Sequence, residues 1–305
     1  EFVRIVRQVP SLPPCALLCF NAGRSPALAG LFVSFNGKST MPDQLFSVAD
    51  QSVLVSGGSR GIGLSLARGF AERDAHVIIT GRDEQTLAAA ADAISVGAHP
   101  VRWQVCDVAD ADQIPPVIDR VIEDLGRIDT LVNVAGVNIR QPVEDFTQDQ
   151  FDFVLDINLR GAFFMAQEVG KTMLARGSGA IINIESLNSD APLKYVAPYA
   201  MSKCGLNAMT RSLAMEWGPS GVRVNGLAPG FILTDLTQKL WSDPTMKDWG
   251  EFNTPMGRLG TPDDLVGTAV FLASPAAAFL SGQTIYVDGG MIAGRVWPIP
   301  QDGGQ

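Results

Sequence analysis

The chain has 305 residues, of which 46% are hydrophobic and 18% charged, as in an ordinary globular protein. Its net charge is −9 and no basic stripe offsets it, which argues against a nucleic-acid partner. Two histidines and four cysteines are too few for most zinc sites, for Ser-His-Asp or Cys-His hydrolases and for a disulfide framework, so we expect no metal site. We also expect no membrane span, because no run of about 18 apolar residues is present.

Residues 1–40 differ from the rest of the chain. Four basic residues face one acid, Glu1, among scattered Pro, Ser and Gly, and the first methionine is Met41. We interpret residues 1–40 as a poorly ordered extension, either a non-native leader ahead of Met41 or a targeting peptide, since transit peptides are basic and poor in acids. The apolar run from Cys15 to Phe20 is short for a secretory signal. We therefore expect a cytoplasmic protein, mitochondrial only if residues 1–40 are a genuine transit peptide.

Short apolar, β-branched runs alternate with segments of helical length from Ser52 onward. The runs are Val53–Val55, Val77–Ile79, Val101–Val105, Leu131–Val134, Ile181–Ile184, Val222–Leu227 and Thr284–Val287. Helical spacing is clear at Glu84–Ile94 and Ile114–Leu125. Strands separated in this way predict βαβ units with right-handed crossovers. We predict one α/β domain over residues 41–305, a doubly wound parallel sheet of the Rossmann-like type with helices on both faces.

A glycine-rich loop follows the first predicted strand. It reads Gly57-Gly58-Ser59-Arg60-Gly61-Ile62-Gly63, and a helical segment begins near Leu64. Glycines allow a tight turn and let backbone N–H groups approach a pyrophosphate, which lies at the positive end of the following helix. A glycine-rich stretch alone is also typical of a plain turn, but the strand before it and the helix after it favour a dinucleotide site.

The end of the second predicted strand bears on the choice of nucleotide. An acid here grips the ribose 2′-hydroxyl of NAD, whereas a cation accommodates the 2′-phosphate of NADP. The chain offers Arg82 after Thr80-Gly81, and Arg60 could form the other half of a clamp; solvated surface arginines are the plain alternative. Asp83 is interpreted as the cap of the next helix. We predict a preference for NADP(H), with NAD(H) possible.

Tyr199 and Lys203 form a pair at the start of a helical segment. Their spacing of four places both side chains on one helix face. A nearby ammonium favours the phenolate, so we expect Lys203 to lower the pKa of Tyr199 from about 10 towards neutrality. Ser186 follows a predicted strand 13 residues earlier. A hydroxyl at the carboxyl end of a strand can bind a carbonyl oxygen as charge develops on it.

Together with further segments, these residues resemble the short-chain dehydrogenase/reductase family from about Phe46 to Ile292. The matching segments are Gly57–Gly63, Asp107-Val108, Asn133-Val134-Ala135-Gly136, Asn158, Ser186, Tyr199, Lys203, Pro229-Gly230 with Thr234, and Val287–Gly290. The resemblance implies a catalytic tetrad of Asn158, Ser186, Tyr199 and Lys203, with Asn158 supporting a proton-relay water.

The resemblance also implies the nucleotide contacts. They are Gly57, Ser59, Arg60, Gly61, Ile62, Gly63, Arg82, Asp107, Val108, Asn133, Ala135, Gly136, Tyr199, Lys203, Pro229, Gly230, Ile232 and Thr234. Asp107 would meet the adenine amino group, Lys203 the nicotinamide ribose, and the segment from Pro229 to Thr234 the nicotinamide. Two residues depart from the family pattern: Val134 replaces an Asn, and Glu185 stands where a small residue is common. We expect Glu185 to have a surface role.

Other stretches are similar to family members that act on sugar acids and polyols, gluconate 5-dehydrogenases among them. They are residues 138–142, 182–184, 197–200 and 254–260. Arg140, Asn188 and Trp241 are the expected substrate contacts; Arg140 could bind a carboxylate through both guanidinium branches, or be an ordinary loop arginine. Residues 233–252 are predicted to form a mobile substrate lid.

The predicted function is an NADPH-dependent reductase, reversible as a dehydrogenase, of a ketose, a keto-sugar acid or a similar small ketone. The alternatives are a 3-oxoacyl-carrier-protein reductase and a catalytically silent nucleotide-binding regulator. The resemblance suggests a homotetramer with helices around Phe151–Ala175 and Tyr199–Trp217 paired across subunits. Apolar residues there, Phe163, Phe164, Met209 and Leu213, are compatible with such pairing or with core packing.

Overall fold

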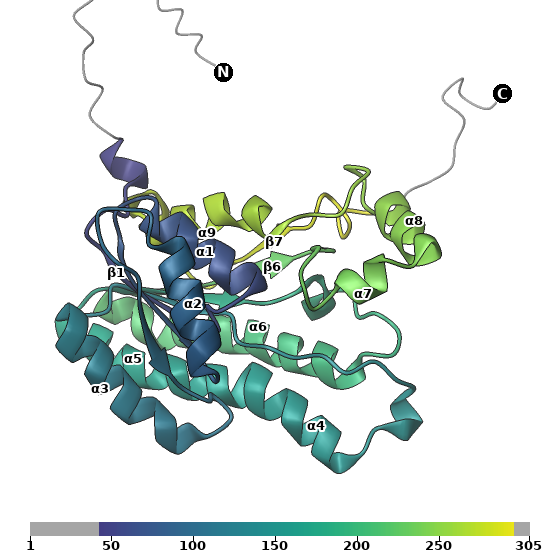
Figure 1. Ribbon diagram of the computed structural model, residues 1–305, viewed down its shortest axis with the longest axis horizontal. Helices are drawn as coiled ribbons and strands as arrows, with labels where there is room; N and C mark the ends of the chain where they lie inside the picture. The colour runs from purple at the N-terminus through teal and green to yellow at the C-terminus, as the bar shows by residue number, and fades with distance from the viewer. Residues whose placement is uncertain (1–42, 296–305) are drawn as a thin grey trace, which may run out of the picture. The chain divides into compact units, whose positions relative to one another are not determined.

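The computed structural model describes residues 43–295, so the interpretation of residues 1–40 lies outside the described part of the chain. Within residues 43–295, strands form a parallel sheet in the order β3-β2-β1-β4-β5-β6-β7 (Figure 1). The strands are β1 (Ser52–Ser56), β2 (His76–Gly81), β3 (Arg102–Val105), β4 (Thr130–Asn133), β5 (Gly179–Ile184), β6 (Val222–Pro229) and β7 (Thr284–Val287). The chain moves outward from β1 to β3, then returns to β4 beside β1, which confirms the predicted doubly wound α/β sheet.

Helices cover both faces of the sheet (Figure 1). One face carries α1 (Gly61–Ala71), α2 (Glu84–Ile94) and α9 (Val266–Ala273); the other carries α3 (Ile114–Leu125), α5 (Ala162–Arg176) and α6 (Ala197–Trp217). A shorter helix, α4 (Gln148–Leu155), leads into α5. The Asp83 side chain accepts a hydrogen bond from the Thr86 backbone N–H, which confirms it as the cap of α2 and lowers its pKa. None of the helices in this described part is long and apolar enough to cross a membrane.

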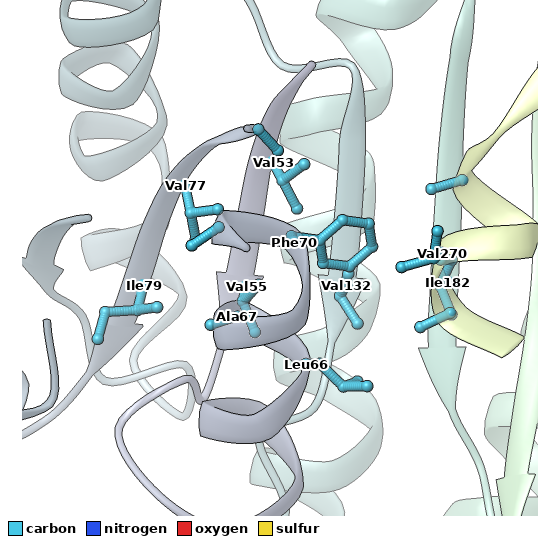
Figure 2. Close-up of a cluster of buried hydrophobic side chains, with 14 of the residues drawn as sticks. Val53, Val55, Leu66, Ala67, Phe70, Val77, Ile79, Val132, Ile182 and Val270 are labelled. Carbon is cyan, nitrogen blue, oxygen red and sulfur yellow. The ribbon is translucent and has the colours of Figure 1, made fainter. Parts of the chain in front are cut away.

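Alternate residues of the central strands point to opposite faces. Val53 and Val55 of β1 lie against α1, whereas Leu54 belongs to the cluster on the other face. Figure 2 shows Leu66 and Phe70 of α1 above this part of the sheet. Burial of a side chain of this size contributes roughly 1.5–3 kcal/mol. The sheet is therefore a rigid support for the loops at its edges.

Two of the residues compatible with subunit pairing or with core packing lie in the core. Met209 and Leu213 are each 7% exposed and pack in the cluster formed with α3 and α5. Their spacing of four on α6 turns them towards the sheet. Phe163, by contrast, is 39% exposed on α5, so only part of the expected apolar surface faces outward.

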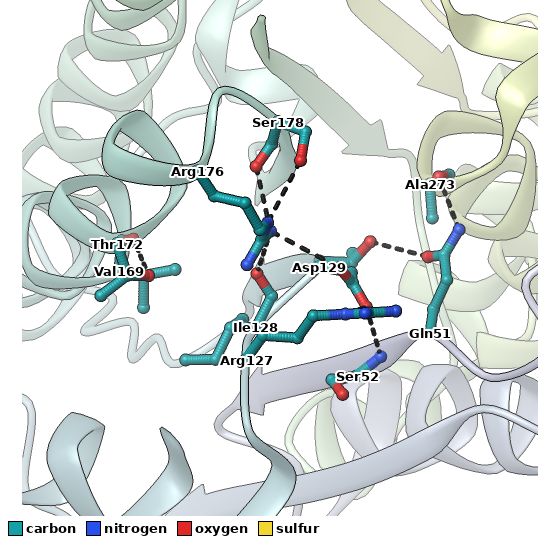
Figure 3. A network of polar contacts seen from close by, with 11 residues as sticks. Gln51, Ser52, Arg127, Ile128, Asp129, Val169, Thr172, Arg176, Ser178 and Ala273 are labelled. Carbon is teal, nitrogen blue, oxygen red and sulfur yellow. Dashed lines mark hydrogen bonds and ion pairs between the residues drawn. The ribbon is translucent and has the colours of Figure 1, made fainter. Parts of the chain in front are cut away.

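The amino-terminal edge of the sheet is held by the Asp129 carboxylate (Figure 3). Asp129 precedes β4, and its Oδ2 accepts hydrogen bonds from the Ser52 backbone N–H at 3.0 Å and the Arg127 Nε at 2.9 Å. The guanidinium of Arg176, at the end of α5, lies 3.5 Å from Asp129 Oδ1 and donates to the Ile128 carbonyl at 2.8 Å. One carboxylate thus joins β1, β4 and α5.

The predicted lid segment contains two short helices, α7 (Gln238–Trp241) and α8 (Pro244–Asn253). Asp243 caps α8 by accepting from the Met246 N–H, and Pro244 occupies its first position. Trp241 is 6% exposed and packs with Phe231 and Leu187 in a small apolar cluster of its own. This satellite cluster attaches the lid segment beyond the carboxyl end of β6.

Candidate active site

The glycine-rich loop is tightly packed where β1 turns into α1. Gly57 has a φ of +84°, and a Cβ there would lie 2.6 Å from the Ala135 nitrogen in the loop after β4. A Cβ on Gly63 would collide with the Gly57 carbonyl. The sequence therefore needs glycine at both positions, because the left-handed φ and the close backbone approach exclude a side chain.

This loop forms one wall of a cleft that gathers most of the predicted nucleotide contacts. They are Gly57, Ser59, Arg60, Gly61, Ile62, Gly63, Arg82, Asp107, Val108, Ala135, Gly136 and Thr234. Gly230 and Ile232 instead face a neighbouring cavity. Asn133 does not line either space: its side chain donates to Asn183 Oδ1 at 3.0 Å and to the Ala162 carbonyl at 3.2 Å, which braces β4 against β5 and α5. Pro229 is buried as the last residue of β6.

The chemistry of the cleft fits an anionic dinucleotide. The residue that caps α1, Arg60, makes no side-chain capping bond, so the N–H groups of the first turn remain for a ligand at the positive end of the helix. Arg60 and Arg82 are both exposed at the cleft, and neither forms an ion pair with another residue of the 43–295 range. Two uncommitted guanidinium groups beside a helix N-terminus suit phosphate groups.

The predicted catalytic residues meet beside this cleft. Tyr199 and Lys203 lie in the first two turns of α6, and Ser186 follows β5. Lys203 Nζ lies 5.7 Å from the centre of the Tyr199 ring and donates a 2.7 Å hydrogen bond to the Ile184 carbonyl. An added Cβ on Gly136 would lie 3.8 Å from Lys203 Nζ and 3.4 Å from Asn158 Oδ1. The loop after β4, the end of β5 and α6 thus bring the four residues together.

The pKa of Tyr199 differs from the expectation. Burial raises the pKa of Tyr199 above its usual value, opposed by a hydrogen bond with Ser186 and by the positive charge of Arg140. The Lys203 ammonium donates to the Ile184 carbonyl. Burial in turn lowers the pKa of Lys203 to about 8. Desolvation outweighs the cation that the four-residue spacing led us to expect.

Asn188, an expected substrate contact, orients Ser186. Its backbone N–H and its Nδ2 donate to Ser186 Oγ at 3.1 and 3.2 Å, and its Oδ1 accepts from the Leu193 N–H at 2.9 Å. A serine oxygen has two lone pairs, so with both acceptor positions engaged, the Ser186 hydroxyl is left to donate its own proton. The hydroxyl is thereby set up to bind a carbonyl oxygen.

Asn158 lies in a π-helical turn, η4 (Asp156–Gly161), between α4 and α5. Its Oδ1 accepts from the Val137 N–H at 2.8 Å, and its Nδ2 donates to the Val137 carbonyl at 2.9 Å and to Ser202 Oγ at 3.1 Å. The side chain therefore ties the loop after β4 to α6. Such π-helical turns occur frequently at functional sites.

A second cavity, of about 770 Å³, opens next to Tyr199 and Ser186. Its walls are mostly apolar: Leu240, Trp241 and Trp249 come from the lid segment, and Leu187, Leu193 and Phe231 from the loops after β5 and β6. Two exposed cations, Arg140 and Lys194, also line it. The buried atoms Trp241 Nε1 and Asn138 Oδ1 have no hydrogen-bond partner among the described residues. The cavity can accept a small anionic molecule that also carries hydrogen-bonding groups.

Two features escaped the sequence-based reasoning. Glu185, expected at the surface, is 1% exposed. The chain's only histidines, His76 and His99, stack at 3.7 Å between ring centres, within 4.8 Å of an Asp50 carboxylate oxygen. The nitrogen lone pairs lie in the ring planes, so stacking keeps them in two separate, nearly parallel planes, which does not favour a shared ion. No local spacing predicts this grouping, because its members come from three separate segments.

The fold, the cleft and the Ser-Tyr-Lys arrangement define a nucleotide-dependent oxidoreductase. A family model described as enoyl-(acyl carrier protein) reductase matches residues 57–292. The chain belongs to the short-chain dehydrogenase/reductase family. It is an oxidoreductase that acts on the CH–OH group of alcohols or on the corresponding carbonyl.

Several relatives of known activity cover most of the chain. A gluconate 5-dehydrogenase of Gluconobacter oxydans is 39% identical over 250 residues, which cover 82% of this chain and 97% of the relative. A D-threitol dehydrogenase of Mycolicibacterium smegmatis is 39% identical over 247 residues, covering 80% and 94%. The crystal structure of a gluconate 5-dehydrogenase from Burkholderia cenocepacia, in complex with NADP and tartrate, is 39% identical with a TM-score of 0.80 and covers 82% of this chain and 98% of that one.

Proposed function

We propose that the protein is an NADPH-dependent reductase, reversible as a dehydrogenase, of a ketose, a keto-sugar acid or a similar small ketone. The observation that carries the proposal is that Tyr199 and Ser186 line the cavity suited to a small molecule, while Lys203 lies beside Gly136 in the wall of the cleft suited to a dinucleotide. The tetrad residues and nucleotide contacts named above are part of this proposal.

The residues of the chain divide the work on the carbonyl. When bound, the nicotinamide supplies the hydride in reduction and accepts it in oxidation. The Ser186 hydroxyl donates to the carbonyl oxygen as negative charge develops there. Because burial raises the pKa of Tyr199, its hydroxyl is protonated at neutral pH and can donate that proton to the forming alkoxide. Oxidation needs the phenolate, so its rate is expected to rise with pH.

The choice of NADPH rests on charge. Arg60 and Arg82 lie at the cleft, and Thr80-Gly81 stand where an NAD enzyme would place an acid. The Burkholderia relative binds NADP, which supports the same choice here. NAD(H) remains the alternative.

The choice of substrate rests on the second cavity. Arg140 and Lys194 offer positive charge for a carboxylate, and Tyr195 and Thr245, which also line the cavity, offer hydroxyl groups for hydrogen bonds. A keto-sugar acid has both kinds of group, and the tartrate held by the Burkholderia relative is likewise a hydroxylated carboxylate. Residues 233–252 would close over this substrate, because Trp241 and Trp249 form part of the wall.

Two further expectations stay predictions. A homotetramer would use the outward apolar residues that remain on α5 and α6, such as Phe163 and Met201, at 39% and 54% exposed. Light scattering of the purified chain measures its molar mass in solution and so tests the tetramer. A cytoplasmic location fits a reaction that draws on NADPH, and the free thiols of Cys106 and Cys204 suit a reducing compartment; cell fractionation tests it.

The proposal is tested by following NADPH oxidation with 5-ketogluconate, fructose or sorbose, a cyclic ketone and an acetoacetyl thioester. We expect the highest kcat/KM with 5-ketogluconate or a related keto acid. Turnover of the thioester alone would replace the proposal with a 3-oxoacyl-carrier-protein reductase. NADPH binding without turnover of any compound would favour the silent regulator.

A further inference from the structure

Glu185 is a buried acid at the end of β5, between Ile184, whose carbonyl holds Lys203, and Ser186. Its carboxylate accepts three hydrogen bonds: from Thr210 Oγ1 at 2.8 Å, from Asn207 Nδ2 at 3.0 Å and from Thr284 Oγ1 at 2.9 Å. A buried carboxylate without partners is strongly unfavourable, so these donors are what makes the charge tolerable here.

The donors come from two elements on either side of the strand end. Lys203, Asn207 and Thr210 stand at positions i, i+4 and i+7 of α6, which form one face of the helix. Lys203 holds the Ile184 carbonyl, and the other two hold the Glu185 carboxylate. Thr284 adds a bond from β7. The residue immediately before Ser186 is therefore fixed against the helix that carries Tyr199 and Lys203.

The neighbouring strand β6 leaves space for the Glu185 side chain. Gly226 of β6 faces the Glu185 carboxylate, and a Cβ on Gly226 would collide with it. The space that a small residue at position 185 would leave is thus occupied by the acid. Glu185 replaces the small residue that is common in the family, and it is buried here because Gly226 leaves space for its side chain.

The carboxylate also acts electrically on Lys203. Burial lowers the pKa of Lys203 to about 8, and the negative charge of Glu185 is the influence that opposes this. Glu185 also acts on Tyr286 of β7, which Asp190, Asp288 and Cys204 influence as well. Burial, followed by the charges of these acids, raises the pKa of Tyr286, so its hydroxyl stays neutral in the working pH range.

We infer that Glu185 is a positioning residue for the reaction: held by Asn207 and Thr210, its carboxylate sets a negative charge on the face of α6 that carries Lys203 and acts on the reacting centre through Lys203. The inference rests on the proposed function, because it assigns Lys203 to the nucleotide and the reacting centre. It adds a fifth side chain to the site, one that touches neither substrate nor nucleotide.

The test is Glu185→Gln, which keeps the shape of the side chain and removes its charge. Two pH profiles are measured: kcat/KM for the best ketone, and NADPH affinity by fluorescence titration. Without the carboxylate, Lys203 loses its proton at lower pH, so the alkaline limb of both profiles should move down by about one pH unit. The loss should reach roughly tenfold near pH 8 and be small near pH 6. Glu123→Gln, an exposed acid on α3, is the matched control and should leave both profiles in place.

A purely structural role would lower both quantities equally at every pH, and that result, or unchanged profiles, overturns the inference. The affinity profile needs no turnover, so it still reports on Glu185 if no ketone is reduced and the proposed function fails. Should Glu185→Gln not fold, Glu185→Ser, which introduces the small side chain common here in the family, is expected to show the same downward shift. An unmoved alkaline limb in that variant also overturns the inference.

Discussion

The two ends of the sheet, an edge formed by the amino ends of the strands and one formed by their carboxyl ends, use polar groups in opposite ways. At the amino-terminal edge, Asp129 Oδ2 accepts from Ser52 and Arg127, and Arg176 lies beside Oδ1, so the charge is neutralised and the strands are joined (Figure 3). The opposite edge leaves polar atoms unpaired. Among the described residues, the buried side-chain atoms without a partner are those of Thr80, Asn133, Asn138 and Trp241, all at or beyond the carboxyl ends of strands.

Three of these four residues border the candidate site: Thr80 lines the nucleotide cleft, and Asn138 and Trp241 line the substrate cavity. An unpaired buried polar atom costs free energy unless something else satisfies it. Between the edges lie clusters of buried apolar side chains on both faces of the sheet, one of which is drawn in Figure 2, so one edge can remain incompletely satisfied while the other holds the strands. Stability and reactivity are therefore expected to respond to different substitutions.

The largest effect is expected at the carboxyl ends of the strands, where the candidate catalytic residues lie. Tyr199→Phe removes the proton donor and should lower kcat by about 10²- to 10⁴-fold while the melting temperature stays close to wild type. Tyr195→Phe is the matched control, since Tyr195 lines the same cavity but is half exposed. Steady-state kinetics and thermal melting decide; unchanged turnover in Tyr199→Phe would remove Tyr199 from the mechanism and favour the silent regulator.

Arg82→Asp is expected to weaken NADPH by roughly 10- to 100-fold in KM, the range of a lost charge-assisted hydrogen bond of about 1.5–3 kcal/mol. The KM for NADH should change little or fall, because a new carboxylate can accept from the ribose hydroxyls. Arg120→Asp on α3 controls for net charge. If the KM values for both nucleotides rise together, the arginine is not reading the 2′-phosphate.

At the other edge, Asp129→Asn should lower the free energy of unfolding by about 1.5–3 kcal/mol, since it weakens charged hydrogen bonds that join β1, β4 and α5. The kcat/KM of the folded enzyme should stay within twofold of wild type. Urea unfolding measures the first quantity, with the exposed Asp119→Asn as control. A large loss of kcat/KM at full folding would contradict the separation of the two edges.

The smallest effect is expected for Arg140→Ala. Arg140 is exposed, so solvent screens it, and KM for carboxylated substrates should rise by only about 5- to 10-fold, with neutral ketones unaffected. Its positive charge lowers the pKa of Tyr199, so its removal should also move the pH dependence of alcohol oxidation to higher pH. Equal effects on neutral and anionic substrates would exclude a carboxylate role.

Much of the fold follows from local pattern. The runs at Val53–Val55 and Val77–Ile79 predict β1 and β2 because strands buried on both faces are continuously apolar. The helix bounds Glu84–Ile94 and Ile114–Leu125 agree with α2 and α3 because polar or proline residues mark their starts. The pairing of Tyr199 with Lys203 is equally local, since it depends on one helix turn.

The remaining features depend on contacts between distant segments. Glu185 is buried because Thr284, 99 residues along the chain, supplies a donor that no motif foretells. Asn188 orients Ser186 through a short turn, η5 (Leu187–Ser189), whose geometry the residue types do not fix. The raised pKa of Tyr199 reflects desolvation, and spacing along a helix carries no information about burial.

One side chain of the lid segment, Leu236, lines both the nucleotide cleft and the substrate cavity. The two spaces therefore share one wall residue. If Leu236 moves when a ligand binds in one space, the opening of the other space changes with it, and binding of one ligand and release of the other would be coupled. The rates at which nucleotide and substrate bind and leave would then depend on a leucine that takes no part in bond making.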